Sequence, residues 1–191
     1  MQLKEYLLNH IQLPESFLDI LNSKFKKATF EKGEFLLKKG EISDKIYFVA
    51  FGVLREFSFL EPESEITLGL ISDQEWIYQV ESFEMGIPSK TNIQVVEKAK
   101  LFYIKKEVLE LLLAQHHEVA LIFLKIYQKY LVQLETRTHL LQLRNVEDRL
   151  ALFMQVQPNI QQAVPQKMIA SYLNTTASNL SKVRSKLLRK K

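Results

Sequence analysis

Hydrophobic and polar positions follow a helical period through residues 1–26. Apolar side chains recur every three or four positions and Pro14 interrupts them, so this stretch predicts two short packing helices. The apolar positions are Leu3, Leu7, Leu8, Ile11, Phe17, Leu18, Leu21 and Phe25.

Residues 27–105 change to short apolar runs rich in Val, Ile, Phe and Tyr, which are typical of strands. The runs are residues 35–37, 46–51, 53–59, 66–71, 93–96 and 101–104. All five glycines of the protein lie in this segment, and we expect them in tight turns because glycine tolerates a positive φ. They are Gly33, Gly40, Gly52, Gly69 and Gly86. Several short strands at this spacing predict an antiparallel sandwich or barrel rather than a parallel sheet.

A long helical segment follows, because residues 107–142 contain no Gly or Pro and their apolar positions return to helical spacing. Taken as one helix, residues 118–142 extend about 37 Å at ~1.5 Å per residue, which is too long for a small domain to cover. The inner apolar stripe is Val119, Ile122, Phe123, Ile126 and Tyr130. A second apolar face consists of Leu121, Leu124, Leu131 and Val132.

The two apolar faces predict that this helix packs on the barrel and also pairs with a second copy of itself. We name the inner stripe, from Val119 to Tyr130, as the residues of the dimer helix. Charged substitutions near Ile126 and Tyr130 are therefore expected to yield monomers. The alternative is a helix buried wholly within one chain.

Residues 164–191 have the pattern of two short helices joined by a tight turn. Pro165 suits the start of the first helix, and Asn174 falls where a left-handed residue is needed between the two. Thr175 or Thr176 can cap the second helix. The inward positions are Ile169, Leu173, Leu180, Val183 and Leu187. This arrangement predicts a helix-turn-helix.

The outward face of the second helix carries polar and basic side chains and no acidic one. We predict that Ser178, Asn179 and Lys182 read base edges, because the N-terminal part of such a helix enters the major groove. We expect another set to contact phosphates or to raise the local potential. It comprises Lys167, Thr176, Arg184, Lys186 and Arg189.

The charge distribution supports a polyanionic partner. The net charge of the 191 residues is +4, but residues 1–143 carry 17 basic and 20 acidic residues, whereas residues 144–191 carry nine and two. A cationic unit on a mildly acidic body favours binding to nucleic acid, although a merely solubilising basic tail is the alternative. The absence of cysteine excludes disulfides, thiolate metal sites and a cysteine nucleophile.

The order of these elements resembles the Crp/Fnr family of bacterial transcription regulators. The likeness rests on residues 32–41 (KGEFLLKKGE) and 46–52 (IYFVAFG), then the long helix, then the helix-turn-helix. The resemblance implies an α+β protein with an N-terminal cyclic-nucleotide-binding-like jelly roll and flanking helices. It implies a sensor domain at residues 1–116, a dimerisation helix at 117–143 and a DNA-binding domain at 144–191. It also implies a homodimer on a pseudo-palindromic operator and, as a further partner, RNA polymerase.

The effector segment of the roll departs from this family. Members that bind cyclic AMP carry a Gly-Glu pair and an Arg-Ser pair, and residues 76–92 contain neither. Ser89, Lys90 and Thr91 are the candidates for holding an anion, but lysine lacks the bidentate fork of arginine. An ordinary turn is the alternative. We expect a small-molecule or nucleotide effector, if one exists, to be something other than cyclic AMP. A wing hairpin is also doubtful, because residues 157–164 leave little space for strands.

Enzymatic function is not supported, and we predict neither catalytic nor metal-ligating residues. A cupin-like enzyme needs ligands on the strands, yet His10, His116, His117 and His139 all lie outside residues 27–105. A protein-interaction module with the same roll but without DNA binding remains an alternative. The start of the chain lacks a basic, apolar leader and no run is apolar enough for a membrane, so we expect a cytoplasmic protein. The operator sequence, and whether transcription is activated or repressed, stay open.

Overall fold

A computed structural model of the chain describes residues 3–10, 15–61 and 64–188. Its helices are α1 (Leu3–His10), α2 (Glu15–Lys24), α3 (Val80–Met85), α4 (Lys106–Gln115), α5 (His117–Gln142), α6 (Val146–Val156), α7 (Ile160–Ala163), α8 (Gln166–Tyr172) and α9 (Ala177–Leu188). Its strands are β1 (Lys26–Phe30), β2 (Phe35–Leu37), β3 (Lys45–Glu61), β4 (Ser64–Ile71), β5 (Trp76–Ile77) and β6 (Asn92–Lys105). Three positions named in the sequence analysis, Ile11, Pro14 and Arg189, lie outside the described residues.

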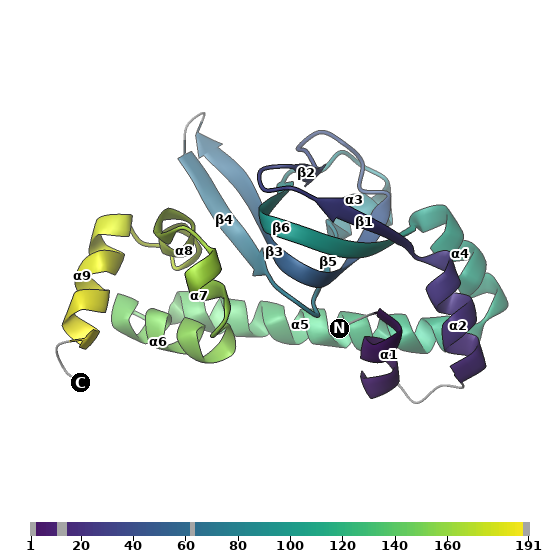
Figure 1. The fold of residues 1–191 in the computed structure, drawn as a ribbon. Coiled ribbons are helices and arrows are strands. Elements are labelled where there is room, and N and C mark those ends of the chain that lie inside the picture. The colour runs from purple at the N-terminus through teal and green to yellow at the C-terminus, as the bar shows by residue number, and fades with distance from the viewer. Residues whose placement is uncertain (1–2, 11–14, 62–63, 189–191) are drawn as a thin grey trace.

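The strands form one antiparallel β-roll, which confirms the predicted α+β class. The strand order is β1-β6-β3-β4, with β2 added to β6 and β5 added to β3. Every pairing is antiparallel. In Figure 1 the long helix α5 passes below the roll, from the α1, α2 and α4 end to the α6–α9 end.

Two pairs of predicted strands are each a single strand. Residues 46–51 and 53–59 belong to β3, and residues 93–96 and 101–104 belong to β6. Gly52 is not in a turn: with φ +112° it bulges β3 against β6, and an added Cβ would lie 2.6 Å from Ala99 Cα. Gly69 is not in a turn either, because it sits within β4 opposite Glu56. Glycine thus marks bulges and close approaches here as well as turns.

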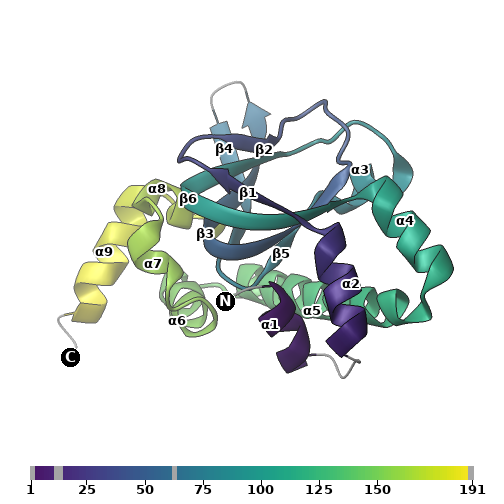
Figure 2. The same cartoon turned by 45° about the vertical axis from the view of Figure 1, so that its right-hand side comes forward.

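The apolar side chains pack in three clusters that join the roll to its helices. One fills the interior of the roll and includes Val49, Leu54 and Leu101. A second lies between the roll, α1, α2, α4 and the first half of α5. The third joins Val53 and Leu70 of the roll to α6, α8 and α9. Figure 2 shows α6–α9 beside the roll. The third cluster shows that these C-terminal helices pack against it.

The helical stretch predicted for residues 107–142 is broken once, at His116. That residue is extended (φ −138°, ψ 108°) and separates α4 from α5. The 26 residues of α5 match the predicted long helix. Among the described residues no helix is long and apolar enough to cross a membrane.

Candidate nucleic-acid interface and interdomain cavity

The turn between α8 and α9 ends the first helix with a left-handed residue, as the sequence predicts. Asn174 has φ +50°. Its N–H donates to the carbonyl of Ser171 at 3.1 Å, and the N–H of Thr175 donates to the carbonyl of Ala170 at 2.9 Å. These two bonds make a Schellman motif, which satisfies carbonyls that a helix end otherwise leaves unpaired.

Thr176 caps α9, which decides between the two threonines that the sequence left open. Its Oγ1 accepts the backbone N–H of Asn179 at 3.2 Å. The Oγ1 of Thr175 instead accepts a hydrogen bond from the side-chain Nδ2 of Asn179 at 2.9 Å. The first turn of α9 is therefore ordered by local hydrogen bonds before any ligand is present.

A shared core fixes the angle between α8, α9 and α6. Ile169 and Leu180 are fully buried, and Leu150 and Phe153 of α6 are buried against the same cluster. Ala170 is also buried, and a small side chain there allows close approach between the helices. Four of the five predicted inward positions are therefore confirmed as core, and Leu187 is partly buried against it.

The three predicted base-reading residues lie together on the exposed face of α9. Ser178, Asn179 and Lys182 are all exposed. Ser178 Oγ lies 3.1 Å from Thr176 Oγ1, while Lys182 forms no ion pair within the described residues. The face is exposed and free of carboxylates, which suits an anionic partner.

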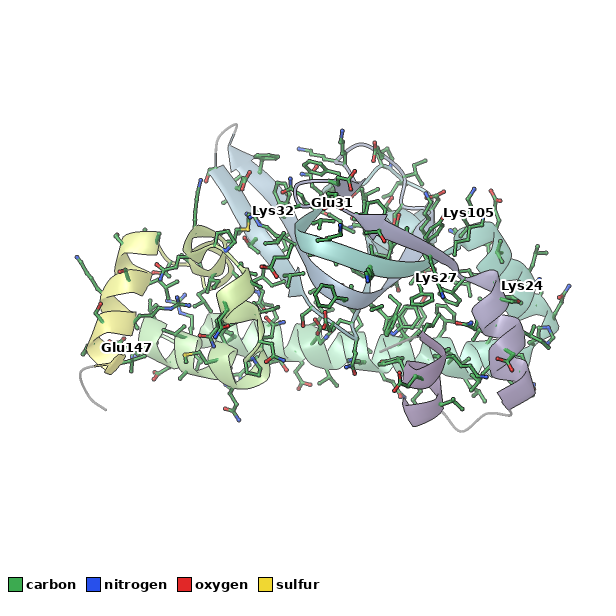
Figure 3. The ribbon with its side chains drawn as sticks, viewed as in Figure 1. Lys24, Lys27, Glu31, Lys32, Lys105 and Glu147 are labelled. Carbon is green, nitrogen blue, oxygen red and sulfur yellow. The ribbon has the colours of Figure 1, made fainter. Side chains whose placement is uncertain are left out.

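The predicted phosphate contacts are less uniform. Lys167 is exposed on α8, but Thr176 is used as the helix cap and Arg184 is half-buried. Lys186 donates to Glu147 of α6 at 3.0 Å, and Figure 3 shows Glu147 at the α9 end of the molecule. Within residues 157–164 the structure has the short helix α7 and no strand, so the described part of the chain has no wing hairpin there.

Two arginines that the sequence analysis did not single out hold the C-terminal end of α8. Arg149 of α6 donates to the carbonyls of Leu173 at 2.7 Å and Asn174 at 3.1 Å. Arg137 of α5 donates to the carbonyl of Tyr172. Cationic donors at a helix C-terminus satisfy free carbonyls and oppose the negative end of the dipole. No periodicity marks these residues, because each acts on a neighbour distant in sequence.

The helix-turn-helix is also joined to the edge strand β4 of the roll. Ser171 Oγ accepts the N–H of Thr67 at 2.8 Å and donates to the carbonyl of Glu65 at 3.2 Å. Gln157 Nε2 donates to the carbonyl of Leu70 at 3.0 Å. Polar groups of an exposed strand edge are thus paired by the C-terminal unit.

The inner stripe of α5 packs on the same chain's roll. Val119, Ile122, Phe123 and Ile126 are buried in the cluster formed with the roll, α1, α2 and α4, and Tyr130 is half-buried. The four buried side chains are therefore not available to a second copy. The second apolar face is exposed, with fractional exposures between 49% and 62%. It consists of Leu121, Leu124, Leu131 and Val132, so these are the apolar residues of α5 that remain available to a second copy.

The effector segment at Ser89, Lys90 and Thr91 is satisfied by its own neighbours. Ser89 Oγ donates to the carbonyl of Thr91 at 2.8 Å and accepts its N–H at 3.1 Å. Lys90 Nζ pairs with Glu81 at 2.6 Å, and Thr91 Oγ1 donates to Glu56 at 2.7 Å. The structure brings the three residues together, and the one cation among them, Lys90, is already paired.

A cavity of about 230 Å³ lies between the roll, α5 and the C-terminal helices. Glu56 and Glu75 line it from the roll, Tyr130 and Arg137 from α5, and Tyr172 from α8. Burial raises the pKa of Glu56, and a hydrogen bond from Thr91 opposes this to a lesser degree. Burial also raises the pKa of Glu75. The sequence analysis missed both carboxylates, because alternation along strands does not tell which polar residue faces an internal space.

No group of three or more metal-ligating side chains occurs among the residues that the structure describes. The sequence-based prediction that the protein has no metal ligands covers all 191 residues, so it stays a prediction.

Comparison with known proteins identifies the roll and the overall arrangement. Residues 27–116 match the family model of the cyclic nucleotide-binding domain. No curated protein sequence matches the chain. The structure of FixK2 from Bradyrhizobium japonicum is similar with a TM-score of 0.75 at 16% identity, over 87% of this chain and 85% of that one.

Two further solved structures share the arrangement over most of their length. CLP, a c-di-GMP responsive global regulator of Xanthomonas campestris, has a TM-score of 0.72 at 15% identity, over 93% of each chain. A protein of Eubacterium rectale assigned to the Crp/Fnr family has a TM-score of 0.70 at 16% identity, over 97% of this chain and 88% of that one. At such identities the likeness establishes the fold.

Proposed function

We propose that the protein is a sequence-specific DNA-binding transcription regulator of the Crp/Fnr type, because residues 27–116 match the cyclic nucleotide-binding domain and the chain shares its fold with a Crp/Fnr protein over 97% of its length. The observation that carries the proposal is the helix-turn-helix with its exposed, carboxylate-free α9. Two of the similar proteins of known structure, from Xanthomonas campestris and Eubacterium rectale, are described as regulators, which supports the proposal.

The proposed contribution of each side chain to DNA binding depends on whether it is exposed and on whether it already has a partner. Ser178 and Lys182, near the start of α9, are the proposed base readers, and Asn179 joins them if its amide exchanges Thr175 for a base edge. Lys167 is the exposed phosphate contact of α8. Lys186 contributes less, because Glu147 already neutralises it.

The proposed active form is a homodimer. Its two recognition helices would enter successive major grooves about 34 Å apart on a pseudo-palindromic operator. The exposed face of α5 at Leu121, Leu124, Leu131 and Val132 supports this, because an apolar helix face of this length is costly to leave in water. RNA polymerase is a proposed further partner, and a cytoplasmic location follows from the same proposal.

Cyclic AMP does not fit the effector segment. A cyclic phosphate needs an unengaged cation, yet Lys90 is paired with Glu81 and the Glu56 carboxylate lies beside Thr91. An anion placed there would meet two acidic side chains. We therefore propose that the regulator does not respond to cyclic AMP.

Selection of bound fragments from a random DNA pool tests the proposed function. We expect an enriched motif with two inverted half-sites and binding that weakens steeply as salt rises. Retention of no motif would refute sequence-specific binding. Binding of a protein partner with little salt dependence, and no retention of DNA, would instead favour the interaction-module alternative.

A further inference from the structure

The cavity between the roll and the C-terminal helices has one carboxylate without a cationic partner. Glu56 Oε1 accepts a hydrogen bond from Thr91, and no basic side chain contributes to the environment that sets its pKa. Gly69 faces Glu56 across the β3–β4 pair, and a Cβ added at Gly69 would lie 3.8 Å from Glu56 Oε2. A partly buried carboxylate without a cationic partner favours a ligand that donates hydrogen bonds or carries positive charge.

The two cations that line the same cavity are engaged elsewhere. Arg137 stacks on Tyr172 and donates to its carbonyl. Lys129 donates to the carbonyl of Gln74 at 3.1 Å and lies over the ring of Tyr6. Glu75 needs no ligand, because Ser72 and Gln133 supply its hydrogen bonds. Glu56 is therefore the acidic group with unused capacity.

The walls of the cavity include aromatic rings and polar atoms that lack partners. Trp76, Tyr78 and Tyr130 line it. The buried Trp76 Nε1 and Gln157 Oε1 find no hydrogen-bond partner among the described residues. Buried polar atoms without partners are uncommon, and two around one space indicate a binding site. The volume of about 230 Å³ is below that of drug-sized sites, roughly 300–1,000 Å³, so a small metabolite fits best.

We propose that this cavity binds a small, flat organic cation of the amidine or aromatic amine class, with its N–H groups on Glu56 and its ring between the aromatic walls. The ligand would touch the roll, α5 and the C-terminal helices at once, because Gln157 and Tyr172 line the same space. That such a ligand acts as an effector rests on the proposed regulator function. The binding itself needs no DNA and is tested without it.

Three planar probes of matched size separate charge from shape: benzamidine, benzamide and benzoate. Trp76 is the protein's only tryptophan and lines the cavity, so its fluorescence reports on occupancy. We expect saturable binding of benzamidine at least ~10-fold tighter than that of benzamide, because a charge-assisted hydrogen bond is roughly twice as strong as a neutral one. Benzoate and cyclic AMP should leave the fluorescence unchanged.

The Glu56→Gln variant tests whether the bound benzamidine cation contacts Glu56. It should lower the affinity for benzamidine to that for benzamide, whereas Glu97→Gln, which changes an exposed carboxylate on β6, should not. Tighter binding of benzoate, a benzamidine preference that survives Glu56→Gln, or no saturable change up to about 10 mM benzamidine would overturn the proposal. If the variant does not fold, the comparison of the three probes on the wild-type protein still tests the proposal. If the protein binds benzamidine but DNA selection yields no motif, the proposed regulator function is refuted and the proposed binding site stands.

Discussion

Arg137 of the long helix α5 stacks its guanidinium on the ring of Tyr172 in α8, with Cζ 3.8 Å from the ring centroid. The same guanidinium donates to the Tyr172 carbonyl and lies 3.5 Å from the carbonyl of Thr67 in β4. One side chain therefore contacts the roll and the first helix of the helix-turn-helix from the helix between them. Burial lowers the pKa of Arg137, and the nearby Tyr172 opposes this.

Replacing Arg137 by lysine should loosen this junction. Lysine lacks the planar fork that stacks and donates in two directions, so we expect the free energy of unfolding to fall by about 1–2 kcal/mol. DNA affinity should fall as well, because α8 loses a contact at its C-terminal end. Denaturant unfolding and DNA titration measure both effects. Arg144→Lys, at an exposed position, is the control, and an equal loss in both variants would contradict the role of Arg137.

Asn174 should be replaceable by glycine but not by alanine. The φ of +50° costs an alanine side chain about 1–2 kcal/mol, whereas glycine adopts it freely. Asn174→Ala is therefore expected to reduce stability by about 1 kcal/mol more than Asn174→Gly. Thermal or denaturant unfolding of the two variants measures the difference. Equal stabilities would mean that the turn relaxes to another conformation.

Lys182 and Lys167 should act differently on DNA. Lys182→Ala is expected to reduce the preference for a selected operator over random DNA, by roughly 1–3 kcal/mol if it reads a base. Lys167→Ala should weaken binding to operator and to random DNA by the same factor. It should also reduce the slope of log affinity against log salt concentration by about 1. Fluorescence anisotropy at several salt concentrations separates these outcomes.

Lys24→Ala is the control for both lysines, since Figure 3 places Lys24 at the end of the molecule away from α9. Parallel losses on operator and random DNA in the Lys182 variant would show that this residue touches only phosphate.

The face of α5 that holds a dimer can be distinguished from the face that holds the roll. Leu131→Asp alters an exposed position with 62% exposure and should give folded monomers. Ile126→Asp places a charge in the core and should lower the free energy of unfolding by several kcal/mol, whatever the oligomeric state. Light scattering with circular dichroism tests both. An unaffected dimer in Leu131→Asp would place the interface elsewhere.

Stability should depend on pH through Glu56. Its pKa in the folded protein is raised above the ordinary value of 4.5, so the folded state binds the proton more tightly than the unfolded state. The wild-type protein should lose stability as the pH rises above 4.5, until Glu56 is ionised in both states. Glu56→Gln should therefore be the more stable protein at pH 7, and its advantage should vanish at pH below 4.5. An unchanged difference across this range would show that Glu56 is not desolvated.

Several elements follow from local patterns in the sequence. Helical spacing with no Gly or Pro predicts α5, and Asn174 followed by two threonines predicts the turn and the cap of α9. These succeed because capping, left-handed turns and amphipathic spacing depend on neighbours a few residues away. The identity of the exposed residues on α9 follows for the same reason.

The strand boundaries and the partner of each polar side chain depended on the tertiary structure. Gly52 marks a bulge and not a turn, because β3 remains paired with β6 on both sides of it. Arg137, Arg149 and Glu56 could not be placed from their neighbours in the chain, since their contacts join distant segments.

The sequence by itself determined an α+β chain with antiparallel strands, a long two-faced helix and a helix-turn-helix, because each of these is encoded by short-range periodicity and turn chemistry. Only the tertiary structure decided which face of α5 the roll buries, and hence which apolar residues stay exposed. It alone placed a carboxylate in a cavity shared with the C-terminal helices. The physical reason is that burial is a property of packed surfaces, and a periodic pattern specifies a face without specifying what covers it.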